Sequence, residues 1–150
     1  MPVCIGRIHH MKNFCIEIPL RWGDMDAMAH VNNTVYFRLM EELRIQWFAA
    51  VGLSTLPIGK GPILAHASCD FIKQLNYPGI AVVSQKVQRL GRSSIETSFT
   101  IGCTADPEAL YASGKAISVF YDYDVGKSLP WPDSVRAAIE GATSEFGTVR

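Results

Sequence analysis

One helix-patterned segment, followed by four strand-patterned segments, most limits what this 150-residue chain can fold into. The helix pattern consists of apolar side chains three or four residues apart: Tyr36, Leu39, Met40, Leu43, Trp47 and Val51. Gly52 follows as a stop signal. The strand patterns cover residues 63–76, 80–90, 94–103 and 110–123, and a looser alternation over 15–22 precedes the helix. This order predicts an α+β fold, with one helix packed on one antiparallel sheet.

The segment 94–103 alternates apolar and polar side chains regularly, which is typical of a half-buried antiparallel strand. Gly114, at the centre of the last strand pattern, indicates a bulge or a close approach of another backbone. Asp133 and Ser134 open a short amphipathic helix that ends near Gly141. We expect a single domain over residues 1–150, with a core over about 12–125 and a C-terminal extension over 126–150.

The long helix is apolar on more than one face, because Phe37, Ile45 and Phe48 lie off its main stripe. One sheet covers only one side of a helix, so this pattern favours burial by a second subunit.

Charge and cysteine content exclude several classes of function. The chain has 14 basic and 14 acidic residues, which argues against a broad surface for nucleic acid or membrane. The four cysteines include no Cys-x-x-Cys pair, so we expect reduced thiols and no metal. The N-terminus lacks the apolar run of a signal peptide, and no segment has the length of a membrane span. These features predict a cytoplasmic protein.

The loop over residues 21–33 carries the densest chemistry. It places Asp24, Asp26 and His30 between the first strand pattern and the long helix. A carboxylate there lies near the positive end of the helix dipole, beside backbone N–H groups that have no partner within the helix. Such a loop can hold an acyl carbonyl and attack it.

The motif is specific enough to resemble a known family. Gly-Asp-Met-Asp-Ala at 23–27 and His-Val-Asn-Asn at 30–33, with Tyr36, Glu41 and Arg44 downstream, resemble the signature of the HotDog-fold acyl-CoA thioesterases. The most similar branch contains 4-hydroxybenzoyl-CoA thioesterase, and the resemblance covers about residues 12–125. It implies a five-stranded antiparallel sheet wrapped around one long helix. It also implies a homodimer or homotetramer with acyl sites at the subunit interface.

The resemblance also implies roles for individual residues. Asp26 matches the catalytic carboxylate, as nucleophile or general base, and the backbone N–H of Asn33 matches the donor that polarises the thioester carbonyl. His30 is a candidate to bond the carboxylate or orient water, and Tyr36 is a candidate to line the acyl pocket. Ala29 stands where close members carry glycine, so a positive φ at this position would strain it.

Arg89, Gly91, Arg92, Ser93 and Ser94 form a second candidate site. Arginine and serine donors suit the phosphates of coenzyme A, and the resemblance places this segment at the nucleotide end of the substrate. Lys73 and Lys86 are further candidate phosphate contacts. Coenzyme A is part of the substrate, so no separate cofactor is expected, and an acyl carrier protein is an alternative thioester donor.

Three alternatives stay open. Another branch of the family takes its acidic residue from the helix, where Glu41 is the candidate, although an ion pair with Arg44 is the simpler interpretation. An R-specific enoyl-CoA hydratase would use Asp26 and His30 to add water to a double bond. A non-catalytic module would bind acyl thioesters without turnover.

Asp24, the other carboxylate of the loop, is expected to bond backbone N–H groups of the loop.

Overall fold

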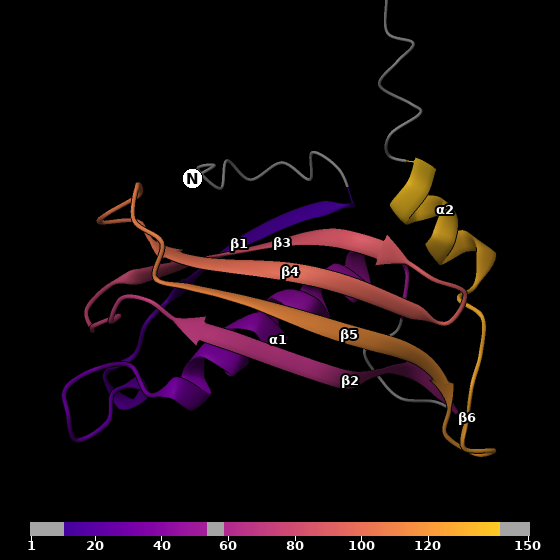
Figure 1. Cartoon of the computed structure of the whole chain (residues 1–150), viewed down its shortest axis with the longest axis horizontal. Coiled ribbons are helices and arrows are strands. Elements are labelled where there is room, and N and C mark those ends of the chain that lie inside the picture. The colour runs from indigo at the N-terminus through magenta and orange to yellow at the C-terminus, as the bar shows by residue number, and fades with distance from the viewer. Residues whose placement is uncertain (1–10, 54–58, 142–150) are drawn as a thin grey trace, which may run out of the picture.

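The computed structural model describes residues 11–53 and 59–141. Figure 1 shows one long helix and one curved sheet, with a short helix beyond the last strands. The elements in chain order are β1 (Asn13–Pro19), the 3-10 turn η1 (Trp22–Asp24), α1 (Asn33–Ala50), β2 (Lys60–Phe71), β3 (Ile80–Leu90), β4 (Ser94–Cys103), β5 (Ala112–Asp122), β6 (Lys127–Ser128) and α2 (Asp133–Gly141).

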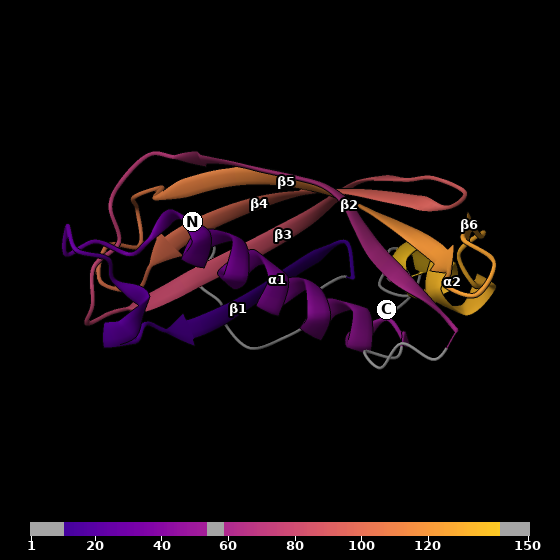
Figure 2. The same cartoon turned by 90° about the horizontal axis from the view of Figure 1, so that it is seen from below.

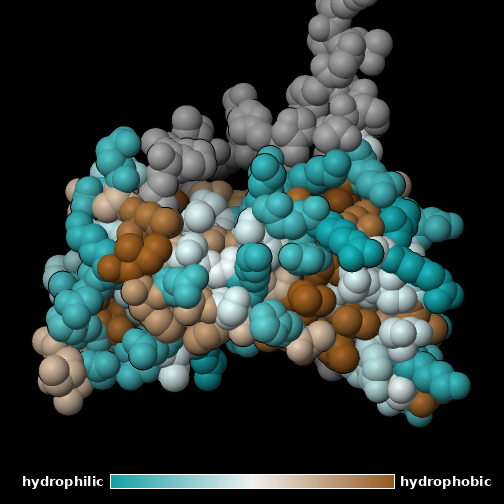
Figure 3. All heavy atoms as spheres, in the orientation of Figure 1, coloured by the Kyte–Doolittle hydropathy of each residue, from teal (hydrophilic) through white to brown (hydrophobic). Residues whose placement is uncertain are grey.

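All strand pairs of the sheet are antiparallel, in the order β1-β3-β4-β5-β2, with the short β6 added to β5. Figure 2 shows α1 lying along one face of this sheet. Figure 3 shows the opposite face, where hydrophilic and hydrophobic side chains are mixed. The α+β prediction is therefore confirmed, and β1 and β2 form the two long edges of the sheet.

The predicted helix stripe forms the core. Tyr36, Leu39, Met40, Leu43 and Trp47 are all buried. Every second side chain of β4 from Ile95 to Ile101 is buried as well, as the regular alternation of that segment predicted. Phe48 lies off the stripe but is covered by the chain itself, because its ring packs on Trp131 at 6.2 Å. Phe37 and Ile45 remain exposed.

The second strand differs from its predicted bounds of 63–76. It runs over Lys60–Phe71. The N–H groups of Ile72 and Lys73 then both donate to the Tyr111 carbonyl, and Leu75 bonds the start of α1. The N–H of Leu75 donates to the Tyr36 hydroxyl at 3.2 Å, and the N–H of Val31 donates to the Leu75 carbonyl at 2.9 Å. Apolar patterning alone does not distinguish these tertiary bonds from sheet pairing.

Gly114 marks a close approach of backbones. A Cβ at this position would collide with the carbonyl oxygen of Ser68 on β2 and would lie 3.2 Å from the Met40 sulfur. The irregularities of pairing occur elsewhere, in β2 and β3. Glycine therefore lets α1 and β2 approach β5 here.

The expectation of four reduced thiols is wrong for Cys15, which is disulfide-bonded, whereas Cys69 and Cys103 are free. Spacing along the chain was the basis of that expectation, and it does not fix distance in the fold. Among the described residues, no helix is long and apolar enough to cross a membrane. The same residues contain no cluster of histidine, cysteine and carboxylate side chains that could hold a metal ion.

Candidate active site

The loop before α1 is a small hairpin. Met25 and Val31 form an isolated antiparallel bridge. Inside it, the N–H of Asp26 donates to the His30 carbonyl at 2.9 Å, and the N–H of Ala29 donates back to the Asp26 carbonyl at 3.0 Å. A three-residue hairpin loop of this kind commonly ends in a left-handed residue.

Ala29 occupies that left-handed position, with φ of 59°. Glycine adopts this positive φ without steric strain. In alanine the same backbone conformation costs about 1–2 kcal/mol. Strained backbone gathers at functional sites, where the surrounding bonds hold it in place. Here those bonds tie Asp26 to the start of α1.

The carboxylate of Asp26 is exposed and held from two sides. One oxygen accepts the N–H of Met28 at 2.9 Å, and the other accepts the side-chain amide of Asn32 at 3.4 Å. The first bond is the Asx turn of a loop aspartate, which also has a purely structural use. The second directs the carboxylate toward the first turn of α1.

Asn32, and not Asn33, is the N-cap of α1. Its side-chain oxygen accepts the N–H of Thr34 at 2.9 Å, and its carbonyl accepts the N–H of Val35 at 2.9 Å. Asn33 is the first helical residue, and among the described residues no acceptor bonds its N–H. This N–H lies at the positive end of the helix dipole, which suits it to bind a developing negative charge.

Asp24 is buried and bonded within its own loop. Its carboxylate accepts the Arg21 backbone N–H at 2.8 Å and the Arg21 guanidinium at 3.3 Å. Its carbonyl accepts the N–H of Asn32 at 3.0 Å. Asp24 thus fastens the loop to the helix start.

Tyr36 is buried, and its hydroxyl is occupied by backbone. It accepts the Leu75 N–H and donates to the Lys73 carbonyl at 3.4 Å, and burial raises its pKa. Tyr36 does not line the pocket described below. The ring of His30 forms no hydrogen bond with any residue that the structure describes, so its link to Asp26 is through backbone alone.

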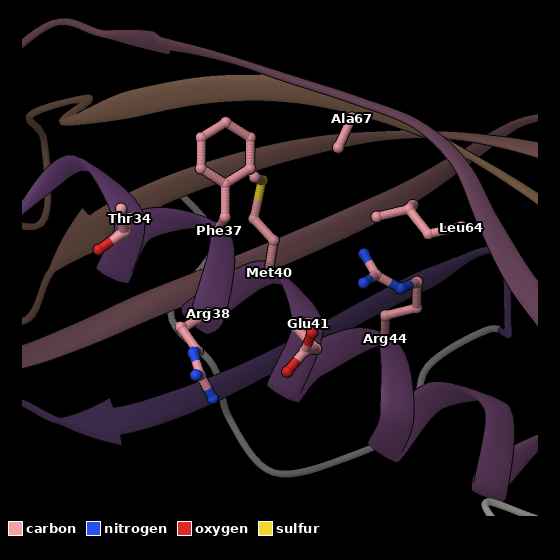
Figure 4. A pocket seen from close by; sticks show the side chains of 8 residues that line it. All are labelled: Thr34, Phe37, Arg38, Met40, Glu41, Arg44, Leu64 and Ala67. Carbon is pink, nitrogen blue, oxygen red and sulfur yellow. The ribbon is translucent and has the colours of Figure 1, made fainter.

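A pocket of about 150 Å³ lies between α1 and the edge strand β2 (Figure 4). It is lined by Thr34, Phe37, Arg38, Met40, Glu41, Arg44, Leu64 and Ala67. Glu41 is exposed and Arg44 is buried, and the ion pair expected between them does not form among the pairs of the described chain. Sequence reasoning singled out Phe37, Met40, Glu41 and Arg44, and it missed the other half of the lining: Thr34, Arg38, Leu64 and Ala67.

The second candidate site lies at the other end of the sheet from Asp26. Pro19, just before the Asp26 loop, pairs with Ile80 at the start of β3, and Arg89 lies near the end of this strand. Eleven strand residues span about 35 Å, so one chain does not bring the two candidate sites together.

The turn after β3 is also bonded to the C-terminal extension. Arg136 of α2 donates to the Gly91 carbonyl at 2.6 Å, and the N–H of Trp131 donates to the Arg92 carbonyl at 2.9 Å. The backbone of Ser93 and Ser94 closes the turn, accepting the N–H groups of Phe120 and Gly91. The side chain of Arg92 remains exposed.

The two lysines proposed as phosphate contacts differ in their surroundings. Lys73 pairs with Asp106 at 2.7 Å and lies 5.1 Å from the centre of the Tyr111 ring. Lys86 is exposed on β3. The paired Lys73 would have to leave its carboxylate to bind a phosphate.

Comparison with known proteins assigns the class of this protein. A protein from Pseudomonas aeruginosa, named as a candidate thioesterase, is 36% identical, and the match covers 84% of this chain and 97% of that one at a TM-score of 0.80. A candidate acyl-CoA thioesterase from Xanthomonas campestris is 33% identical over 73% of this chain and 92% of its own, at a TM-score of 0.66. A 1,4-dihydroxy-2-naphthoyl-CoA thioesterase from Synechocystis shares the fold, at 20% identity over 85% and 95% of the chains and a TM-score of 0.77.

The fold is thus the HotDog fold, as the sequence predicted, and the protein is a thioester hydrolase. The model of the thioesterase-like superfamily matches residues 20–139, and the chain belongs to that family. The match includes both candidate sites and most of α2.

Proposed function

We propose that this protein hydrolyses acyl-CoA thioesters to a carboxylic acid and free coenzyme A. The observation that carries the proposal is that the Asp26 carboxylate accepts the side-chain amide of Asn32, the N-cap of α1, while the N–H of the next residue, Asn33, has no acceptor among the described residues. The names of the similar proteins from Xanthomonas campestris and Synechocystis, which include acyl-CoA and aroyl-CoA thioesterases, support the same substrate class.

In the proposed mechanism, Asp26 attacks the carbonyl carbon or removes a proton from the attacking water. The Asn33 N–H donates to the oxygen as negative charge develops on it. Collapse of the tetrahedral intermediate breaks the carbon–sulfur bond and expels the coenzyme A thiolate. Because a thiolate is a good leaving group, this step needs no strong general acid. If Asp26 is the nucleophile, water then cleaves the anhydride that it forms with the acyl group.

Glu41 is a second candidate for the catalytic carboxylate, and one observation favours it. It lines the pocket between α1 and β2, whereas Asp26 does not. In that case the thioester would lie beside Glu41, about two turns after the start of α1, instead of at its first N–H group.

Thiol release with a colorimetric reagent tests both assignments. A panel of short, medium, long and aromatic acyl-CoAs is compared for the wild type, Asp26→Asn and Glu41→Gln. We expect Asp26→Asn to lower kcat by about 10²–10⁴-fold, the usual contribution of a general base. A collapse in Glu41→Gln with an active Asp26→Asn would transfer the role to Glu41. A separate assay follows the absorbance of an enoyl-CoA. Loss of that absorbance without thiol release would mean that the enzyme is a hydratase. Binding of acyl-CoA without either reaction would indicate the non-catalytic module.

We also propose that the active form is a homodimer or homotetramer. Exposed apolar side chains follow α1 and the edge strand β2, namely Phe37, Ile45, Leu64 and Phe71. A second subunit would cover them, and it could supply the coenzyme A contacts that lie about 35 Å from Asp26 within one chain. Light scattering measures the mass of the oligomer directly.

Two further expectations stay predictions. An acyl carrier protein as the thioester donor is tested by measuring thiol release from acyl-loaded carrier protein. A cytoplasmic location is tested by cell fractionation.

A further inference from the structure

Arg44 is a buried cation whose partner is missing from the described chain. The residue is only 9% exposed. Its guanidinium forms neither an ion pair nor a hydrogen bond with any described residue. Charged side chains in protein interiors are normally paired, because an isolated charge loses its hydration without compensation. Burial accordingly lowers the pKa of Arg44, and the charge of Glu41 only partly opposes this effect.

The guanidinium points into the pocket. Figure 4 shows it turned from α1 toward Leu64 on β2, whereas Arg38 extends away from that strand. Arg38 and Arg44 against the single Glu41 leave the lining with a net charge of +1. The rest of the wall is apolar or neutral, and includes Phe37 and Met40. An anionic group in the pocket would therefore neutralise a charge that the chain leaves uncompensated.

We propose that this pocket binds a carboxylate at the far end of the acyl chain through Arg44. The inference rests on the proposed thioesterase function and specifies its substrate class as coenzyme A monothioesters of dicarboxylic acids. A guanidinium matches a carboxylate with two parallel hydrogen bonds, which fixes the chain end as well as neutralising it. Phe37, Met40 and Leu64 would contact the methylene groups between the two ends, with the second subunit of the proposed oligomer covering the outer side of Phe37 and Leu64.

The geometry of α1 sets the length of that chain. The pocket extends from Thr34, which follows Asn33, to Arg44, a distance of about 15 Å along the helix axis. The Arg44 side chain leans back toward the helix start and covers about 6 Å of it. The remaining gap of about 9 Å fits an extended chain of about six to eight carbons, at about 1.3 Å per carbon. The volume of about 150 Å³ admits the acyl part of the substrate and not the nucleotide.

Matched substrate pairs test the proposal. Thiol release is measured for hexanoyl-CoA against adipoyl-CoA and for octanoyl-CoA against suberoyl-CoA. We expect the diacid thioester to have a kcat/KM at least about tenfold higher in each pair. Arg44→Met, which keeps the length of the side chain, should reverse this preference. Lys115→Met removes one positive charge from the opposite face of the sheet and should leave the ratio unchanged. Equal rates within each wild-type pair, or a ratio unaffected by Arg44→Met, would overturn the proposal.

A binding measurement separates this site from catalysis. Calorimetry with free adipate should show binding to the wild type, none to Arg44→Met, and none for hexanoate with either protein. Adipate binding without thiol release from any acyl-CoA would refute the thioesterase function while the anion site stands. Thiol release without any preference for adipoyl-CoA over hexanoyl-CoA, together with no binding of free adipate, would refute the anion site alone.

Other occupants of the pocket give different results. Inorganic phosphate and coenzyme A are titrated as the competing anions, and Arg44-dependent binding of these without adipate would overturn the assignment to an acyl carboxylate. A fall in oligomer mass in Arg44→Met, with no response to adipate in the wild type, would show that a carboxylate of a second copy pairs with Arg44. Glu145 is the one acidic residue outside the described ranges, and adipate binding that appears only in Glu145→Gln would likewise overturn the proposal.

Discussion

Replacing Ala29 by glycine should stabilise this protein, although glycine substitutions usually destabilise. Ala29 is exposed and has φ of 59°, so the change loses little packing and removes a steric conflict of about 1–2 kcal/mol. Glycine also increases the entropy of the unfolded chain, which costs about 0.4–1 kcal/mol. The difference is a gain of about 0.5–1 kcal/mol, or a rise in Tm of about 1–4 °C for a chain of this size.

Ala27 provides the matched control, because it lies in the same exposed loop and its φ is not positive. Ala27→Gly should therefore lower the stability by about 0.4–1 kcal/mol, through the unfolded chain alone. Both variants and the wild type are unfolded in urea at one fixed protein concentration, since an oligomer's stability depends on concentration. If Ala29→Gly lowers the midpoint as much as Ala27→Gly does, the strain argument is wrong.

Two further substitutions test the bonds that hold the Asp26 loop and the start of α1. Asn32→Ala removes the side-chain cap of α1 and should lower the free energy of unfolding by about 0.5–2 kcal/mol in a urea titration, whereas Gln46→Ala on the exposed face of the same helix is a control that should change it little. Tyr36→Phe leaves the buried N–H of Leu75 without an acceptor, so it should cost about 1–3 kcal/mol by the same measurement. A loss below about 0.5 kcal/mol in Tyr36→Phe would mean that water or another group replaces the hydroxyl.

Much of the fold follows from local patterns in the sequence. The stripe from Tyr36 to Trp47 specifies α1, because side chains three or four residues apart share one face of a helix. The alternation over Ser94–Cys103 specifies β4 for the equivalent reason in a strand. The end of β2 differs from the predicted bound, since after Phe71 the N–H of Ile72 bonds the Tyr111 carbonyl and that of Leu75 bonds Tyr36 of α1, outside the strand pairing.

The Asp26 loop was also visible in the sequence, and so was Ala29 as the position where a positive φ would be strained; the structure shows that φ is positive there. The choice of Asn32 over Asn33 as the cap was not, because either residue type can perform that function and only the backbone geometry decides. The hydrogen bond from Arg136 to the Gly91 carbonyl in the turn after β3 was likewise not predictable from the sequence, since the two residues are 45 positions apart.

The sequence by itself determined the class of fold, the family and the loop that carries Asp26, because these depend on residues close together in the chain. The tertiary structure decided which groups share a cavity. Arg44 and Leu64 line one pocket only because β2 pairs with β5 and lies beside α1. The two predicted sites are separate only because β3 is about 35 Å long. Contacts between distant segments depend on how the whole sheet is assembled, and no local pattern records that assembly.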